Sequence, residues 1–168
     1  DLNLLENTAD LNVTATREGN LITVVVSVFN ANAGHDIPTD SPLRQILLSV
    51  NATDPNGNEI PLKNGPTMPD WTGDYAGTPG IYFAKVLEEL WTNVSPTASY
   101  WMQTRLNEDT RLSAFETRTV EFVFEAPEES VITINTSLIY RRAYYDLMQQ
   151  KGWNTPDILM EQEIIEME

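Results

Sequence analysis

His35 is the residue whose chemistry is easiest to define, because it is the only histidine among 168 residues. Gly34 lies directly before it and Pro38 follows three residues later. Glycine accepts the positive φ of a tight turn and proline fixes φ, so the imidazole is expected on a stiff loop between two strands. A neutral imidazole is a good metal ligand, and its ring can equally bond a backbone carbonyl and hold the loop. From the residues alone we favour the second, structural role.

Cations that could serve a site are few, since 10 lysines and arginines face 25 aspartates and glutamates. Arg44, Arg141 and Arg142 are three of them. A planar guanidinium pairs with a carboxylate through two parallel hydrogen bonds, and it recognises other anions in the same way. With so many carboxylates available, we favour internal salt bridges for these arginines.

Two acidic segments carry oxygen ligands of the kind that calcium prefers. Residues 54–59 have oxygen side chains at alternate positions around a glycine, but an Asn-Gly hairpin turn explains each of them. Asp70 and Asp74, with Trp71 and Tyr75 beside them, are candidates for a calcium site or for a platform that stacks on a sugar. We favour a solvated loop anchored by its tryptophan.

The sequence has no pattern typical of an enzyme active site. It lacks a Gly-x-Ser-x-Gly elbow, a glycine-rich phosphate loop and a second histidine for a metal pair. Paired carboxylates stay open as a source of acid–base chemistry, although nothing distinguishes any two of the acids. We therefore expect a protein without catalytic activity.

Composition argues against several kinds of partner. The net charge of −15 repels phosphate backbones, so nucleic acid is not expected, and it disfavours anionic membrane surfaces. No apolar run approaches the roughly 18 residues of a membrane span. The absence of cysteine removes disulfides, thiolate metal sites and covalent haem attachment within this chain. Asn-x-Ser/Thr triplets begin at Asn12, Asn51, Asn93 and Asn135, and their glycosylation depends on the source organism.

Alternating apolar and polar residues predict an all-β protein. The alternation is clearest at 21–29, 46–52, 119–124 and 130–140, and a shorter run at 11–16 precedes a turn. Residues 54–58 signal a hairpin that 60–62 would complete. Such strands are typical of an immunoglobulin-like antiparallel β-sandwich, and we expect a single domain over 1–168. The start at Asp1 without methionine favours a domain excised from a larger protein.

Several segments depart from this alternation. Residues 63–80 hold three prolines and four glycines, which predicts a long central loop. Residues 81–91 fit either the start of a strand or a short helix. Residues 141–151 predict one C-terminal helix stopped by Gly152, and 158–167 predict a final edge strand. The pairs Tyr100-Trp101 and Tyr144-Tyr145 are expected to fill the core or an interdomain face.

Three motifs follow one another in a distinctive order. Residues 34–40 read Gly-His-Asp-Ile-Pro-Thr-Asp, with Pro42 and Arg44 after them. Residues 80–87 read Gly-Ile-Tyr-Phe-Ala-Lys-Val-Leu, and the tail over 138–160 contains Tyr-Arg-Arg-Ala and Lys-Gly-Trp. In this order they resemble the cysteine-free β-sandwich domain at the C-terminal end of certain multihaem c-type cytochromes. Asp40 stands where that family has glycine.

The resemblance implies a non-catalytic accessory domain of an extracytoplasmic multihaem cytochrome. Haem c would be bound in an adjoining region of the parent protein, and this domain would pack against that region and support electron transfer. His35 would contact haem with Arg44 as its support, and Arg141 and Arg142 would contact haem propionates or the neighbouring region. The alternative is a secreted or cell-surface module that binds carbohydrate or protein through residues 63–80.

Overall fold

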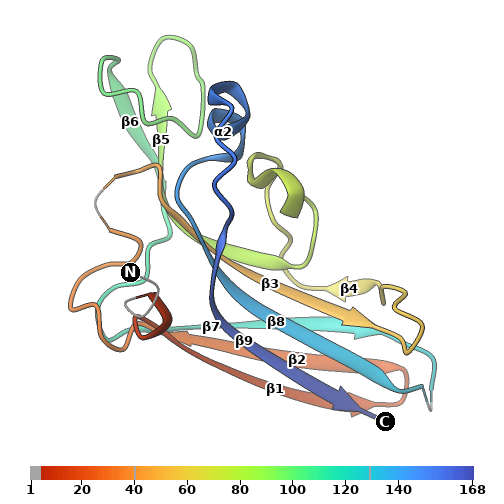
Figure 1. Ribbon diagram of the computed structural model, residues 1–168. Coiled ribbons are helices and arrows are strands. Elements are labelled where there is room, and N and C mark those ends of the chain that lie inside the picture. The colour runs from red at the N-terminus through yellow and green to blue at the C-terminus, as the bar shows by residue number, and fades with distance from the viewer. Residues whose placement is uncertain (1–4, 40, 129) are drawn as a thin grey trace.

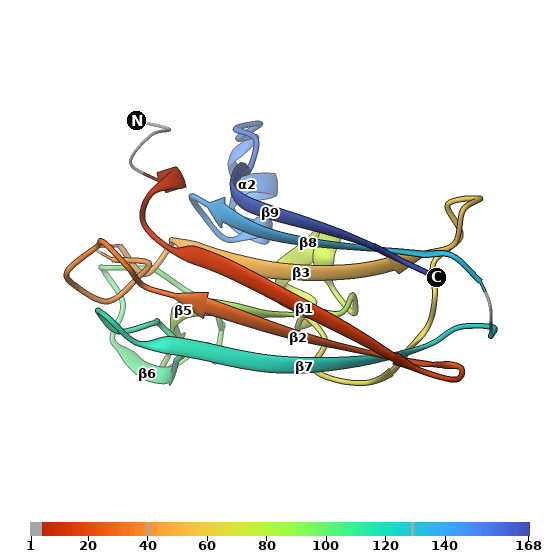
Figure 2. The ribbon, with the colours of Figure 1, turned by 90° about the horizontal axis from the view of Figure 1, so that it is seen from below.

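Two antiparallel sheets face each other in the computed structural model, which describes residues 5–39, 41–128 and 130–168 (Figures 1 and 2). The first sheet has the order β1-β2-β7-β4, formed by Asp10–Glu18, Leu21–Phe29, Thr117–Glu125 and Leu62–Asn64. The second has the order β6-β5-β3-β8-β9, formed by Thr104–Asp109, Gly80–Glu89, Gln45–Thr53, Ile132–Arg141 and Ile158–Met167. The predicted antiparallel β-sandwich is confirmed.

The core lies between the sheets and is made by alternate residues of the facing strands. Successive side chains of a strand point to opposite faces, so a regular alternation places all apolar residues on one side. The inward-facing residues are nearly fully buried: Ile22, Val24, Val26 and Val28 of β2, Phe122 and Phe124 of β7, Ile46, Leu48 and Val50 of β3, and Ile132, Ile134 and Leu138 of β8. The alternation in the sequence therefore identified the buried faces correctly.

The second sheet is also covered on its outer face. There, Leu47 of β3 packs with Met68 and Ile139 in a separate apolar cluster. This cover explains why β3 is buried at each position from Gln45 to Val50. The covering segment is more ordered than the predicted long loop, because it contains β4 and the 3-10 helix η1 (Asp70–Tyr75).

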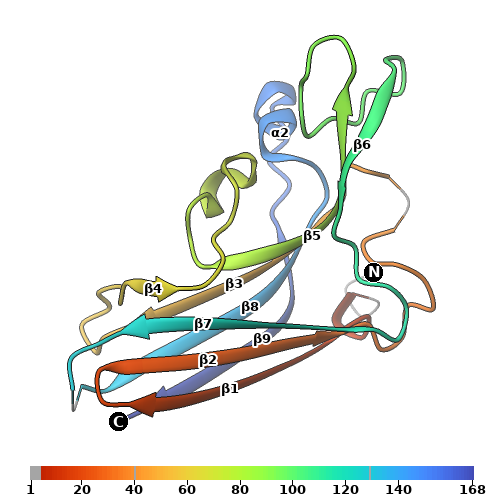
Figure 3. The ribbon, with the colours of Figure 1, turned by 180° about the vertical axis from the view of Figure 1, so that it is seen from behind.

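The segment that fitted either a strand or a helix is β5, and this strand leaves the sandwich halfway along. Residues 80–84 pair with β3, whereas 85–89 pair with β6. Residues 85–109 consequently form an arm that projects beyond the two sheets (Figures 1 and 3). The sequence did not predict β6, because its residues are mostly exposed and show no alternation.

Two predicted boundaries are wrong. Helix α2 spans Tyr145–Lys151 and begins four residues later than expected, because Arg141 still belongs to the β8 ladder opposite Gln45. The hairpin with β3 forms, with Thr53 and Glu59 as an antiparallel bridge, but it ends at Ile60 instead of extending to Leu62. After the N–H of Ile60 donates to the carbonyl of Ala52 at 2.8 Å, the chain crosses to the first sheet as β4.

Three other expectations are confirmed. Gly57, at the predicted turn, has a φ of 82°. Gly152 ends α2 in the left-handed conformation. β9 is an edge strand of the second sheet. None of the helices in the described residues is long and apolar enough to cross a membrane.

Gly73 is the point where η1 meets α2. Its φ is 66°, and a Cβ built on it would lie 2.1 Å from Cγ of Tyr145. The ring of Tyr145 therefore occupies the space that a side chain at residue 73 would need.

We expect Gly73→Ala to lower the free energy of unfolding by about 2–4 kcal/mol, because a strained backbone is added to a clash with the ring. Gly77→Ala is the matched control: its φ is 75° and nothing lies within 4 Å of the added Cβ. It should cost only the backbone strain of about 1–2 kcal/mol. Urea unfolding measures both, and equal losses would contradict a close Gly73–Tyr145 contact.

Candidate functional site

His35 lies exposed in the loop that joins β2 to β3. Its Nδ1 is 3.0 Å from the carbonyl oxygen of Asp36. A carbonyl oxygen only accepts, so Nδ1 is the donor in this contact, and in the neutral ring the lone pair is then on Nε2. The ring thus holds the loop through one nitrogen and leaves the other as an acceptor.

Asn30 anchors this loop from the core side. Its buried side chain donates through Nδ2 to the carbonyl of His35 at 2.8 Å and to that of Leu112 at 3.0 Å. Ile37 and Leu112 then exchange two backbone hydrogen bonds of 2.9 Å each. The His35 loop is therefore fixed to the segment that precedes β7.

An ionic network ties the same loop to the base of the arm. Nη2 of Arg111 lies 2.7 Å from an oxygen of Asp109 and 3.5 Å from an oxygen of Asp36. Hydrogen bonds from Arg111 lower the pKa of Asp109, and Asp109 in turn raises the pKa of Arg111. Since Asp109 ends β6, these ion pairs connect the loop to the base of the arm.

The candidate arginines lie in two places. Nη1 of Arg44 donates to the carbonyl of Thr39 at 3.4 Å. The side chain of Arg44 therefore contacts the backbone of the His35 loop. Arg141 is only 2% exposed, and its guanidinium bonds the carboxylate of Asp157 at 2.8–3.2 Å. Arg142 is exposed next to it. Asp40, the departure from the family motif, lies outside the described residues.

The candidate calcium ligands Asp70 and Asp74 are both exposed on η1. In the part of the chain that the structure describes, no group of three or more histidines and acids could hold a metal ion. Trp71, between them, packs edge-on against Tyr82 and Tyr144, with ring centroids 4.7 and 6.0 Å away. Its ring is therefore engaged within the protein rather than displayed as a platform.

Asp54, in the other acidic segment, uses its carboxylate to form the turn. Its Oδ1 accepts the backbone N–H of Asn56 at 2.8 Å and of Asn58 at 2.9 Å. These bonds, above all those from Asn58, lower the pKa of Asp54. The residues of this turn therefore serve its geometry.

A groove of about 780 Å³ lies between the arm and α2. Five aromatic residues line it: Trp71 of η1, Tyr100 and Trp101 of the arm, and Tyr144 and Trp153 at the two ends of α2. Tyr144 is buried, whereas Tyr100 and Trp101 are 92% and 70% exposed. The pairs Tyr100-Trp101 and Tyr144-Tyr145, for which the same role was expected, therefore differ in exposure. Sequence reasoning missed the groove, because its residues come from segments that only the fold brings together.

Glu89, also among the lining residues, fixes the arm wall of the groove. It is 8% exposed. One carboxylate oxygen accepts the hydroxyl of Thr92, and the other accepts that of Thr97 at 2.9 Å. Hydrogen bonds from Thr92, Ser99 and Thr97 lower the pKa of Glu89. The ionised carboxylate therefore holds residues 92–99 in place.

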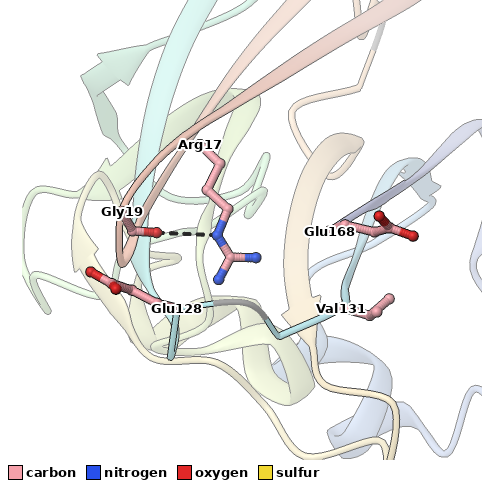
Figure 4. Close-up of a pocket in the computed structure, with 5 residues that line it drawn as sticks. All are labelled: Arg17, Gly19, Glu128, Val131 and Glu168. Atoms are coloured by element: carbon pink, nitrogen blue, oxygen red, sulfur yellow. Dashed lines mark hydrogen bonds between the residues drawn. The ribbon is translucent and has the colours of Figure 1, made fainter.

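Another cavity, of about 540 Å³, lies beside Arg17 and is lined by the turn after β1 and by Glu168 (Figure 4). Nε of Arg17 donates to the carbonyl of Gly19 at 3.1 Å, and its terminal nitrogens donate to the carbonyls of Pro127 and Ser130. The guanidinium thus joins two backbone turns. We therefore assign Arg17, beside this cavity, a structural role.

The sequence matches no family model and no curated protein. Its fold is similar to the crystal structure of a penta-heme cytochrome c552 from Thermochromatium tepidum, with a TM-score of 0.76 and 21% sequence identity. The match covers 99% of this chain and 41% of that chain, so this chain spans less than half the length of the cytochrome. At this identity the likeness shows a shared fold.

We expect the arm to loosen in acid through Glu89. Because its pKa in the folded protein lies below the ordinary 4.5, its stabilisation is complete above that pH and is lost as the pH falls through the lowered value. Tryptophan emission should then change in the wild type. Glu89→Gln should show the altered spectrum already at neutral pH.

The matched control is Glu88→Gln, which removes the neighbouring carboxylate that pairs with Arg105 at 2.8 Å. It should keep the wild-type acid transition. An unchanged acid transition in Glu89→Gln would contradict the role of Glu89.

Proposed function

We propose that this chain is a non-catalytic accessory domain of an extracytoplasmic multihaem cytochrome, which packs against the haem-bearing region and supports electron transfer there. One observation carries the proposal: 99% of the chain matches part of a penta-heme cytochrome whose chain is more than twice as long. The motifs around residues 34–44 and 80–87 support the same assignment independently of the fold.

The residues of this chain fit haem in one way and not in another. Covalent attachment needs cysteine, of which the sequence has none. An axial contact fits His35, because the ring is exposed and the contact of its Nδ1 with Asp36 leaves the Nε2 lone pair available. When bound, haem iron supplies one-electron redox chemistry. The chain contributes the imidazole and a loop that is fixed before any contact is made.

Phe115 supports a contact surface at the same end of the sandwich. Its φ is 61°, which is unfavourable for a bulky residue, and its side chain is 69% exposed. Its N–H donates to the carbonyl of Asn30 at 3.0 Å, and the Asn30 side chain holds His35. An exposed aromatic held on a strained backbone, and linked through Asn30 to the His35 loop, supports a contact surface at this end of the sandwich.

The alternative proposal, a carbohydrate- or protein-binding module acting through residues 63–80, has less support. Trp71 is the side chain of that segment best suited to stacking on a ligand. Its ring packs against Tyr82 and Tyr144 instead. The geometry therefore favours the cytochrome proposal.

The experiment is a titration of a ferric haem peptide, with an open axial position, by the isolated chain. We expect wild type to shift the Soret band, because Nε2 of His35 fills that position, and we expect His35→Ala to leave the band in place. Saturating the iron with cyanide beforehand should abolish the shift and serves as the control. No shift in wild type, or the same shift in both proteins, would contradict the axial contact.

A further inference from the structure

Large apolar side chains are exposed mainly around the arm. They include Leu90, Trp91, Val94, Tyr100 and Trp101, and Trp153 lies across the groove. Tyr100 and Trp101 form an edge-to-face pair with ring centroids 5.0 Å apart. Of these residues, Val94, Tyr100, Trp101 and Trp153 line one groove, and exposed apolar side chains that gather at one place are typical of a surface that a partner covers.

The opposite wall of the groove is equally unpartnered. No residue of α2 is fully buried, and Leu147, Gln150 and Lys151 line the groove. The helix is held from its other side, where the ring of Tyr145 contacts Gly73. Its groove side is consequently available to a ligand.

The floor of the groove is preformed. Tyr144 is buried, and its hydroxyl donates to the carbonyl of Pro42 and lies 3.2 Å from that of Lys85. Burial raises the pKa of Tyr144, so the hydroxyl stays protonated. The end of the His35 loop, the base of the arm and the start of α2 therefore meet at one side chain.

The aromatic walls suit a flat apolar group, and Lys151 can pair with one acidic group at its edge. Indole and phenol rings provide surfaces for stacking. Of the described residues that line the groove, Lys151 is the one cation. The carboxylate of Glu89 is occupied by Thr92 and Thr97, which leaves Asp146 as the exposed acid. A porphyrin with its propionates has the complementary properties.

The size of the groove agrees with such an occupant. Its volume of about 780 Å³ lies within the roughly 300–1,000 Å³ typical of cofactor-sized sites. We propose that the groove covers the exposed edge of a haem in the haem-bearing region, through Trp101, Trp153 and Lys151. The inference rests on the proposed function and names the surface that meets that region. It does not involve His35.

The tryptophans of the chain provide the readout. Three of the four, Trp71, Trp101 and Trp153, line the groove, and Trp91 lies on the arm outside the lining. Haem absorbs where tryptophan emits, so a bound haem quenches the emission by energy transfer. The probe is a ferric haem peptide saturated with cyanide, so that His35 has no access to the iron. We expect saturable quenching of the wild type.

Variants locate the contact. Trp101→Ala and Trp153→Ala should each raise the midpoint of the quenching titration roughly fivefold or more, because each removes a stacking surface. Lys151→Gln should raise it about two- to fivefold and weaken its salt dependence. Trp91→Ala is the matched control, an exposed tryptophan of the same arm, and should leave the midpoint within about twofold of wild type. Circular dichroism and thermal unfolding check that every variant folds.

The outcomes separate this inference from the proposed function. A His35-dependent Soret shift without saturable quenching would keep the axial contact and overturn the groove. Quenching that depends on Trp101 and Trp153, without a His35-dependent shift, would keep the groove and overturn the axial contact. Equal midpoints for the Trp91 and Trp101 variants would overturn the inference. So would dimerisation through the groove, seen by sedimentation, or selective binding of an oligosaccharide there.

Discussion

One buried arginine organises the outer face of the second sheet. Arg141 ends β8, and its guanidinium bonds Asp157 just before β9 and the carbonyl of Thr72 in η1, the latter at 2.6 Å. Its central carbon lies 5.2 Å from the ring centroid of Tyr75 and 5.9 Å from that of Tyr145. A buried charge without partners is strongly destabilising, so η1, α2 and the start of β9 must all converge on this side chain.

The position of the groove follows from that convergence. Tyr145 is the first residue of α2, and its ring lies between Arg141 and Gly73. The ion pair therefore positions one wall of the groove, although it contributes no lining residue. The other wall depends on a different constraint, the departure of β5 from the sandwich after residue 84. Tyr144 joins the two, because its hydroxyl reaches the carbonyl of Lys85.

The sequence predicted well those strands in which buried and exposed residues alternate along the strand. β2 and β8 were predicted nearly to their ends, because one face of each is packed in the core and the alternation is unbroken. β6 was missed, since it pairs only with β5 and has no buried face to impose a pattern. His35 could be found as a candidate because the chain has a single histidine. The groove could not, because residues 71, 89–102 and 144–153 become neighbours only through the fold.

The departure of β5 from the sandwich also separates a part of the chain that can vary from a part that must be kept. Lys85 and Asp109, the residues at which the arm begins and ends, are register partners in the β5–β6 ladder. Paired residues in an antiparallel ladder lie only about 5 Å apart, so the arm departs from and returns to the same place. The arm can therefore change in length, in aromatic content and at its tip without a change in the core of the sandwich. A lineage could diversify what this domain touches without having to re-evolve the scaffold beneath it.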